Sequence, residues 1–292
     1  RYNSSGNWGW LEHSSNRDKI EVYKGDIRDY DSVKDAMKDI EVVFHLAALI
    51  GIPYSYISPL AYVKTNVEGT YNVLQAAKEH RVDRVVHTST SEIYGTAQYV
   101  PIDENHPFNP QSPYAASKAA ADHLALSYYR SFGLPVTVIR PFNTFGPRQS
   151  ARAVIPTIIS QIASGKQEIK LGSLTPTRDL NYVLNTVEGF YSVGLHGNTV
   201  GETINIGSNR EISIGDLARL IGKMMKQEVR IQAESERLRP KNSEVERLLC
   251  DFSKAESLAS WRPTFSLEEG LEETIKWISN NVSFFKVETY SI

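Results

Sequence analysis

The sequence contains a single cysteine, Cys250, among its 292 residues. One thiol forms no disulfide within the chain and supplies no cysteine-based zinc site, and such scarcity is typical of a reducing compartment. An excess of charge is also lacking, since 32 Lys and Arg against 34 Asp and Glu leave a net charge of −2. We therefore expect no nucleic-acid partner, because binding a phosphate backbone needs a basic surface. The seven histidines are scattered, so we expect no metal site.

Long hydrophobic runs are missing as well. The longest, from Val42 to Ile52, is shorter than a membrane-spanning helix and is interrupted by His45. The N-terminal residues lack the apolar stretch of a signal peptide. The sequence thus predicts a cytoplasmic protein that does not enter a membrane. Its composition, 41% hydrophobic and 23% charged, is that of a globular protein with a packed core.

Strand-like and helix-like stretches alternate along most of the chain. Apolar or β-branched runs predict strands at residues 20–24, 41–46, 82–90, 135–140, 168–171 and 203–206. Helical spacing of apolar residues predicts helices at 31–37, 60–78, 113–131, 153–163, 183–193 and 266–280. This alternation is typical of an α/β fold whose helices cover both faces of a doubly wound parallel sheet. After Arg140 the loops lengthen and gain Pro and Gly, which indicates a smaller, intertwined C-terminal lobe.

A glycine-rich turn is lacking where such a sheet would bind a dinucleotide. That site consists of a first strand, a glycine-rich turn and a helix whose N-terminus holds the pyrophosphate. Here Gly6 and Gly9 follow no strand, so they do not form that turn. We expect the first strand and its turn to be absent from this sequence. An α/β fold without a dinucleotide therefore stays open at this point.

Residues suited to proton transfer follow the strand predicted at residues 82–90. Thr90, Ser91 and Glu92 lie at its end, and open α/β sheets bind ligands at the carboxyl ends of their strands. Tyr114 and Lys118, four residues apart, share one face of the next helix. An ammonium beside a phenol favours the phenolate and lowers its pKa from about 10 toward the range of a general base. The Tyr–Lys spacing alone also fits a surface pair, but together these residues indicate an active site.

The motifs and their order resemble the extended short-chain dehydrogenase/reductase superfamily of NAD-dependent nucleotide-sugar epimerases and dehydratases. The resemblance runs from about residue 20 to residue 281. It is carried by His45-Leu46-Ala47-Ala48, Tyr114 with Lys118, Arg140-Pro141-Phe142-Asn143-Thr144-Phe145-Gly146-Pro147 and Arg178-Asp179-Leu180-Asn181-Tyr182-Val183. It implies a Rossmann-like dinucleotide-binding domain over residues 1–150, with about 177–207 returning to it. Residues 151–176 and 208–292 would then form the substrate-binding lobe.

Within that superfamily, Thr90-Ser91-Glu92 resembles the nucleotide-sugar 4,6-dehydratases, because epimerases and decarboxylases usually have no Glu at the third position. Residues 51–56 and 149–156 are similar to bacterial enzymes that dehydrate nucleotide-linked N-acetylglucosamine in legionaminic-acid-type pathways. Ser91 stands where dTDP-glucose 4,6-dehydratases carry Asp, whereas GDP-mannose dehydratases share the Ser. The resemblance implies conversion of UDP- or GDP-N-acetylglucosamine to its 4-keto-6-deoxy sugar.

The resemblance also implies a role for each site residue. Tyr114 takes the proton of the sugar 4-hydroxyl, Lys118 keeps Tyr114 ionised, and Thr90 holds the reacting hydroxyl. Glu92 removes the C5 proton and passes it to the departing 6-hydroxyl, so that Ser91 need not act as an acid. The cofactor is NAD, with NADP left open. Its expected contacts are Asp26, Ile27, Leu46, Ala47, Ala48, Tyr114 and Lys118. The substrate diphosphate is expected at Asn143, Arg148, Arg178 and Arg239, since guanidinium groups match phosphate oxygens.

Two other functions remain alternatives. A nucleotide-sugar 4-epimerase or UDP-glucuronate decarboxylase would share Tyr114 and Lys118, and Glu92 distinguishes the dehydratase from both. A non-catalytic sugar-nucleotide binding protein gains support only from the missing glycine-rich turn.

A homodimer is the expected assembly. The helix predicted at residues 60–78 has apolar residues at helical spacing, and the helix at 114–131 is apolar around much of its circumference, including Ala121 and Ala125. Small residues allow a neighbouring helix to approach closely, so this surplus face is a candidate interface. The resembling family pairs these two helices across a two-fold axis.

Overall fold

The computed structural model describes residues 7–287. Its strands are β1 (Val42–His45), β2 (Arg84–Thr88), β3 (Val136–Pro141), β4 (Asn143–Phe145), β5 (Glu168–Leu171), β6 (Thr177–Tyr182), β7 (Thr203–Ile206), β8 (Glu211–Ser213) and β9 (Arg230–Ala233). Its α-helices are α1 (Tyr30–Ala36), α2 (Ile52–Ile57), α3 (Pro59–Tyr62), α4 (Gly69–His80), α5 (Pro113–Phe132), α6 (Val154–Ala163), α7 (Val183–Leu195), α8 (Ile214–Met224), α9 (Ser253–Ala259) and α10 (Leu267–Asn280). A π-helical segment, η3 (Val63–Glu68), joins α3 to α4, and a 3-10 turn, η4 (Ser91–Tyr94), follows β2.

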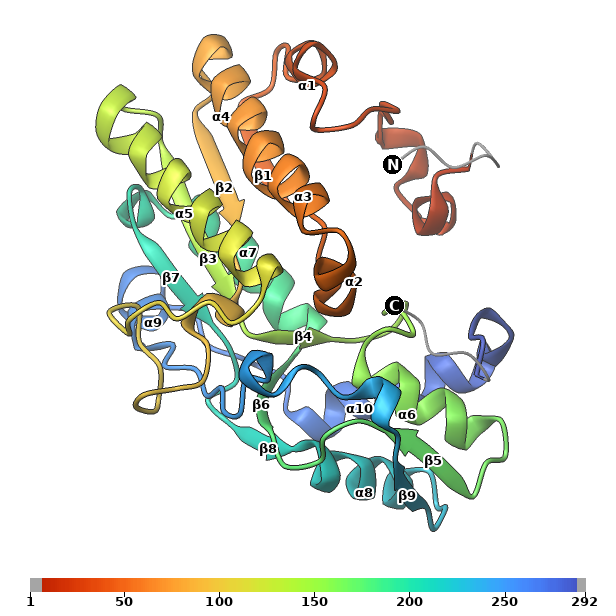
Figure 1. The fold of residues 1–292 in the computed structure, drawn as a ribbon. Coiled ribbons are helices and arrows are strands. Elements are labelled where there is room, and N and C mark those ends of the chain that lie inside the picture. The colour runs from red at the N-terminus through yellow and green to blue at the C-terminus, as the bar shows by residue number, and fades with distance from the viewer. Residues whose placement is uncertain (1–6, 288–292) are drawn as a thin grey trace.

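The main sheet is parallel and has four strands in the order β1-β2-β3-β7 (Figure 1). The predicted α/β fold with a parallel, Rossmann-like sheet is confirmed. Since all four strands run in one direction, their carboxyl ends meet at a single edge. β1 ends there at His45, β2 at Thr88 and β3 at Pro141. That edge is where an open α/β sheet binds ligands.

Helices cover both faces of this sheet. Neighbouring residues of a strand point to opposite faces, and on β2 Val85 and Val86 do so. Val85 packs with Leu74 of α4 and Ala125 of α5, whereas Val86 packs with Val193 of α7. Helices α4 and α5 therefore lie side by side on one face, with α7 on the other (Figure 1). On the α7 side of β1, the side chains of Val42 and Phe44 are exposed.

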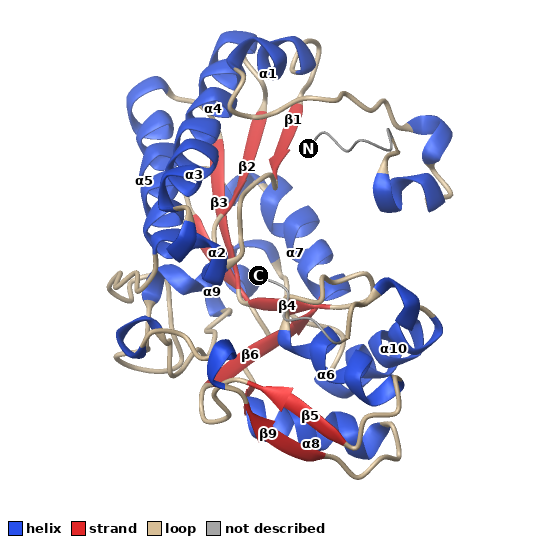
Figure 2. Ribbon diagram, turned by 45° about the vertical axis from the view of Figure 1, so that its right-hand side comes forward, coloured by secondary structure: helices blue, strands red, loops and turns tan. Residues whose placement is uncertain are grey.

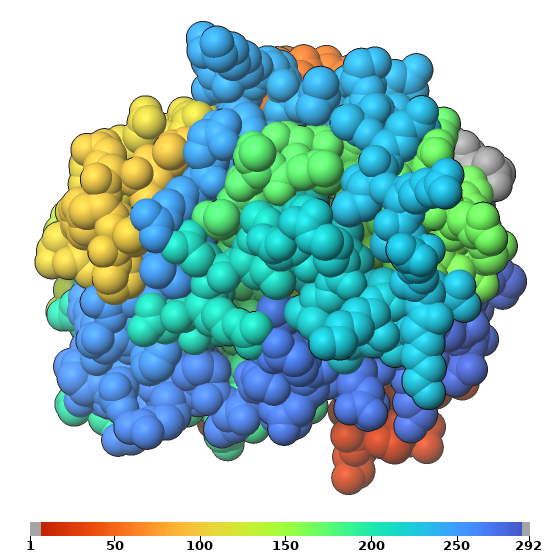
Figure 3. Space-filling model, turned by 90° about the horizontal axis from the view of Figure 1, so that it is seen from below, coloured from red at the N-terminus to blue at the C-terminus, as the bar shows by residue number. Residues whose placement is uncertain are grey.

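A second group of elements packs below the main sheet (Figure 2). It contains a three-stranded sheet, β4-β6-β8, and a two-stranded sheet, β5-β9. Ile158 of α6, Leu217 of α8 and Leu271 of α10 pack in one core cluster there. Seen from below, this face consists mainly of segments after residue 150, coloured green to blue (Figure 3). The assignment of this second group of elements as the substrate-binding lobe stays a prediction.

The segment at residues 20–24, predicted as a strand, forms no strand, and that prediction is wrong. A strand needs a partner for its backbone hydrogen bonds, and within residues 7–287 β1 pairs only with β2. Glu21, Tyr23 and Lys24 are exposed, so the alternating pattern of this segment has no sheet surface to cover.

The long helix predicted at residues 60–78 is present as α3, η3 and α4, which follow one another from Pro59 to His80. The π-helical segment lies in its middle, where the Asn66 carbonyl accepts a hydrogen bond from the Thr70 hydroxyl at 2.6 Å. The capping box predicted at Ser266 and Glu269 is present at the start of α10. No helix within residues 7–287 has the length and apolar character needed to cross a membrane.

Gly95 ends η4 in a backbone conformation (φ 65°, ψ −156°) that side chains disfavour. A Cβ at this position would lie 2.2 Å from the Asn109 carbonyl oxygen. We expect Gly95→Ala to lower the free energy of unfolding by about 3 kcal/mol, measured by urea denaturation. Gly133→Ala is the matched control: Gly133 also has a positive φ, 69°, but a Cβ there meets nothing within 4 Å. It should lose only about 1 kcal/mol, and equal losses would contradict this account.

Candidate active site

The end of β2 places Glu92 below the protein surface. The Thr90 hydroxyl accepts a hydrogen bond from the Glu92 backbone N–H at 3.3 Å and so caps η4. Thr90, Ser91 and Glu92 are all buried, with Glu92 only 6% exposed. The Thr90 cap and the turn that follows it hold Glu92 at the carboxyl edge of the sheet.

The start of α5 brings Tyr114 and Lys118 to the same edge. Ser112 caps this helix, since its hydroxyl accepts the Ala115 N–H at 3.1 Å, and Pro113 fits the first helical position. Tyr114 and Lys118 are buried on one face of the helix, as their spacing predicts. The Lys118 ammonium donates a hydrogen bond to the backbone carbonyl of Thr88, at the end of β2.

These buried groups influence one another's pKa values. Burial raises the pKa of Tyr114 above its ordinary value, a hydrogen bond from Thr90 opposes the rise, and the Glu92 charge adds to it. Burial lowers the pKa of Lys118 to about 8, and the Asp122 charge opposes this shift. The expected lowering of the Tyr114 pKa is therefore wrong for this arrangement. The pKa of Tyr114 rises because burial outweighs the effects that lower it. The Lys118 ammonium is hydrogen-bonded to the Thr88 carbonyl and not to the Tyr114 hydroxyl.

An apolar wall shields Tyr114 from water. Ile52 of α2 and Tyr62 of α3 form one cluster with Tyr114, and the Tyr62 and Tyr114 rings meet edge to face at 6.2 Å. Asn66 fixes the loop before α2, accepting the Leu49 N–H at 2.8 Å and donating to the Leu49 carbonyl at 2.9 Å. The sequence analysis did not predict α2, although Pro53 at its first turn was a signal for it.

The residues expected to contact a dinucleotide lie beside this site. Leu46 and Ala47 are exposed and Ala48 is half-buried, in the coil that follows β1 at the carboxyl edge. Small side chains and open backbone there fit a cofactor that approaches closely. Asp26 is exposed, and hydrogen bonds from Arg28 lower its pKa to about 2. Within residues 7–287 no glycine-rich strand–helix turn provides N–H groups for the pyrophosphate.

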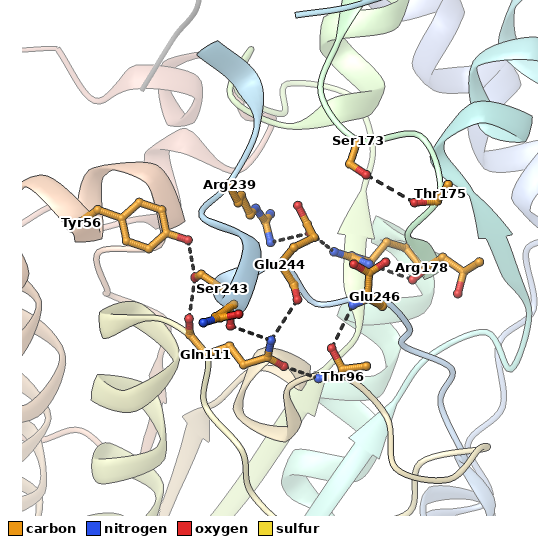
Figure 4. A network of polar contacts seen from close by, with 12 residues as sticks. Tyr56, Thr96, Gln111, Ser173, Thr175, Arg178, Arg239, Ser243, Glu244 and Glu246 are labelled. Atoms are coloured by element: carbon orange, nitrogen blue, oxygen red, sulfur yellow. Dashed lines mark hydrogen bonds and ion pairs between the residues drawn. The ribbon is translucent and has the colours of Figure 1, made fainter. Parts of the chain in front are cut away.

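A polar pocket of about 250 Å³ lies between β4, β6 and the segment after β9. Asn143, Arg178 and Arg239 line it, so the structure brings together three of the four predicted substrate contacts. Glu244 lies between the two arginines, 3.1 Å from Arg178 and 3.5 Å from Arg239 (Figure 4). Arg152, from the loop before α6, lines the pocket too. An anion with several oxygens fits this set of donors.

Arg148, the fourth predicted substrate contact, lies elsewhere. Its side chain is exposed, its φ is 68°, and its guanidinium lies over the ring of Trp10 at 5.7 Å. It does not line the pocket. The cation–π contact with a residue far away in the sequence holds Arg148 there, and no local pattern signals it.

The segment that carries Glu244 is tied to both sides of the site. The Ser243 hydroxyl bonds the Tyr56 hydroxyl of α2 at 2.6 Å and donates to the Gln111 carbonyl at 2.5 Å (Figure 4). The Gln111 side-chain amide in turn donates to the Glu244 carbonyl at 2.9 Å. These contacts fix the pocket wall relative to α2 and to the loop before α5.

Glu92 influences both Tyr114 and one arginine of the pocket electrostatically. Its charge opposes the lowering of the Arg178 pKa that burial causes, and it also raises the pKa of Tyr114. Glu92 therefore lies within electrostatic reach of both Tyr114 and Arg178.

The family model described as GDP-mannose 4,6 dehydratase matches residues 1–274 of this chain. The chain belongs to this family. Human dTDP-D-glucose 4,6-dehydratase is 34% identical over 284 residues, which cover 94% of this chain and 80% of that protein. The presence of Tyr114, Lys118 and the parallel sheet in one arrangement agrees with this membership.

Two solved structures of the same fold have different activities. The dTDP-glucose 4,6-dehydratase DesIV from Streptomyces venezuelae, with NAD bound, superposes with a TM-score of 0.83 at 29% identity and covers 93% of this chain and 85% of its own. The UDP-N-acetylglucosamine 4-epimerase from Methanobrevibacter ruminantium, in complex with UDP-N-acetylmuramic acid, gives 0.84 at 31%, covering 95% and 88%. The chain is thus an NAD-dependent nucleotide-sugar dehydratase or epimerase.

The sequence analysis missed residues that act through their neighbours. Glu244 gave no signal, because its position between two arginines depends on the path of the segment after β9. Asp122 did give one: it lies four residues after Lys118, as Lys118 lies after Tyr114, so all three share a helix face.

Lys118 contributes to stability with a pH dependence whose sign follows from its pKa. That pKa is about 8 in the folded protein and 10.5 ordinarily, so between these values the unfolded chain binds more protons. The stability of the wild type relative to Lys118→Met therefore rises from pH about 8 to about 10.5, by up to about 3 kcal/mol. Urea unfolding of both proteins measures it, with the constant difference at lower pH as the baseline. A difference that falls across this window would contradict the prediction.

Proposed function

We propose that this protein is a nucleotide-sugar 4,6-dehydratase that acts on UDP- or GDP-N-acetylglucosamine. The observation that carries the proposal is the buried carboxylate of Glu92 beside Tyr114. A 4-epimerase needs only a base for the 4-hydroxyl, whereas a dehydratase needs a second group that removes the C5 proton. Thr90 and η4 hold Glu92 where it can serve as that group.

Tyr114 and Lys118 serve the first step. Tyr114 accepts the proton of the sugar 4-hydroxyl while Thr90 holds that hydroxyl in place. Burial favours the neutral phenol, so the Lys118 ammonium must stabilise the phenolate when Tyr114 acts as a base. The apolar wall of Ile52 and Tyr62 excludes water and strengthens this electrostatic interaction.

Glu92 serves the elimination. The 4-ketone acidifies the C5 proton, Glu92 removes it, and the same proton then goes to the 6-hydroxyl, which leaves as water. After the elimination, C5 must take up a proton again. The proton that Tyr114 removed from the 4-hydroxyl balances this uptake. A single group acts as base and then acid, so Ser91 in the middle of the triplet is compatible with the reaction.

NAD, when bound, would supply the hydride-transfer chemistry, from C4 of the sugar and back to C6. Leu46, Ala47 and Ala48 would contact it along the edge after β1, and Lys118 would hold its ribose. Asp26 and Ile27 would lie at its adenine end. These assignments rest on the resemblance and on the position of the residues at the carboxyl edge.

The arginine pocket would hold the substrate diphosphate. Arg178 and Arg239 are already oriented by Glu244, and the buried side-chain oxygen of Asn143, which has no hydrogen-bond partner, can accept a hydrogen bond from a hydroxyl or N–H group of the substrate. We assign this pocket to a substrate-binding lobe of residues 151–176 and 208–292. The UDP-linked ligand of the epimerase from Methanobrevibacter ruminantium supports a uridine nucleotide here.

Mass spectrometry of the product separates the candidate functions. With NAD and UDP-N-acetylglucosamine, we expect the wild type to remove one water from the sugar. Glu92→Gln should abolish that loss while reduced cofactor accumulates, because an amide cannot accept the C5 proton. Tyr114→Phe is the control, since it blocks the first step and no reduced cofactor should form. Unchanged substrate mass with interconverted 4-epimers would identify an epimerase, and loss of carbon dioxide from UDP-glucuronate a decarboxylase.

We also propose a symmetric homodimer through the outer face of η3, α4 and α5. On this face Val63 and Tyr71 are exposed, and Ala116 and Ala120 of α5 leave room for a close neighbour. Two positions expected in the interface are not available to it. Ala121 and Ala125 are fully buried within their own chain.

Charge on the outer face should break the dimer. We expect Val63→Glu and Ala120→Glu to give a monomer by light scattering, since each places a carboxylate in the buried interface. Tyr191→Glu, at an exposed apolar position on α7, is the matched control and should leave the dimer intact. A monomeric wild type at micromolar concentration would refute the proposed assembly.

A further inference from the structure

Behind the catalytic residues lies a buried carboxylate that accepts hydrogen bonds from β3 and from the residue directly after β2. Asp122 of α5 is fully buried and accepts the Ser89 hydroxyl at 2.7 Å and the Arg140 Nε at 3.1 Å. Its other oxygen lies 3.3 Å from Nε2 of His87. His87 belongs to β2, Ser89 directly follows that strand, and Arg140 belongs to β3. Asp122 thus joins α5 to both strands at the catalytic edge.

Arg140 extends the network to the turn that carries Glu92. The Arg140 Nη1 donates to the Tyr94 hydroxyl at 2.8 Å, and Tyr94 donates to the Asn205 side chain at 2.8 Å. Its guanidinium also lies over the Phe108 ring at 4.7 Å. Tyr94 is the last residue of η4, two positions after Glu92. Arg140 is 3% exposed, so both of its arms are shielded from water.

The charged side chains of this network, Asp122 and Arg140, are shielded from solvent. Burial alone would raise the pKa of Asp122, but His87, Arg140 and Ser89 keep it below its ordinary value. The charged and titratable groups that face Asp122 are Lys118 on its own helix, His87 on β2 and Arg140 on β3. A buried ion pair adds little stability compared with apolar side chains of similar size. The effect of this ion pair is geometric, because it fixes the positions of α5, the end of β2, β3 and η4 relative to one another.

We propose that Asp122 and Arg140 are positioning residues that fix the two catalytic segments at the same sheet edge. This inference rests on the proposed function. The Asp122–Ser89 arm holds the face of α5 that carries Tyr114 and Lys118 against the end of β2. The Arg140–Tyr94 arm holds η4 and therefore Glu92. Each arm serves one chemical step, proton removal from the 4-hydroxyl or from C5.

Step-resolved kinetics test the two arms separately. We expect Asp122→Asn to lower kcat by about 100-fold with an unchanged KM and no accumulation of reduced cofactor, because Tyr114 and Lys118 lose their register. Tyr94→Phe should lower kcat by about 10-fold and raise the steady-state fraction of reduced cofactor, because only Glu92 is displaced. That fraction does not depend on how much of the protein is folded, so mere destabilisation would leave it unchanged.

Tyr128→Phe is the matched control. Like Tyr94, Tyr128 is a buried tyrosine whose hydroxyl forms a side-chain hydrogen bond. It lies on α5 and bonds Gln75 at 3.0 Å, away from the site. It should leave kcat and the reduced fraction as in the wild type. If Asp122→Asn does not fold, Ser89→Ala removes one hydrogen bond of the same arm and should slow the first step in the same way.

The outcomes separate this inference from the proposed function. A wild type that removes no water would contradict the dehydratase and with it the assigned steps. An active wild type whose Asp122→Asn or Ser89→Ala variant keeps full kcat would overturn the first arm alone. A Tyr94→Phe variant with an unchanged reduced fraction would overturn the second.

Discussion

The common direction of β1, β2 and β3 is the constraint on which the site depends. Because the strands are parallel, each chain segment that leaves the sheet at its carboxyl edge starts beside the others. The coil with Leu46, the turn with Glu92 and the strand with Asn143 are far apart in the sequence but begin at this edge. The N-terminus of α5 returns to it and adds Tyr114 and Lys118. No single loop makes the site.

Desolvation then determines the chemistry of these side chains. Burial raises the pKa of Tyr114 and lowers that of Lys118, so each is moved toward its uncharged form. The buried charge of Arg178 is paired with the half-buried carboxylate of Glu244. Water exclusion and charge pairing therefore occur together, as expected where an isolated charge would cost several kcal/mol.

Residues whose role follows from spacing within one element were predictable from the sequence. Tyr114 and Lys118, the capping box of α10 and most helices and strands of the main sheet are of this kind. The strand expected at residues 20–24 failed because pairing depends on a neighbour that a local pattern does not specify. Arg148 and Glu244 show the same limit, since one is held by Trp10 and the other lies between two arginines from distant segments. Contacts between segments distant in sequence need the fold itself.

One edge of β1 determines how the main sheet can be extended. Within residues 7–287 this strand has a neighbour on one side only, and Val42 and Phe44 are exposed on its α7 face. A strand edge with free N–H and C=O groups beside apolar side chains is a template for pairing with another chain. Among the described residues this edge is therefore open to a further parallel strand, which would continue the main sheet beyond β1.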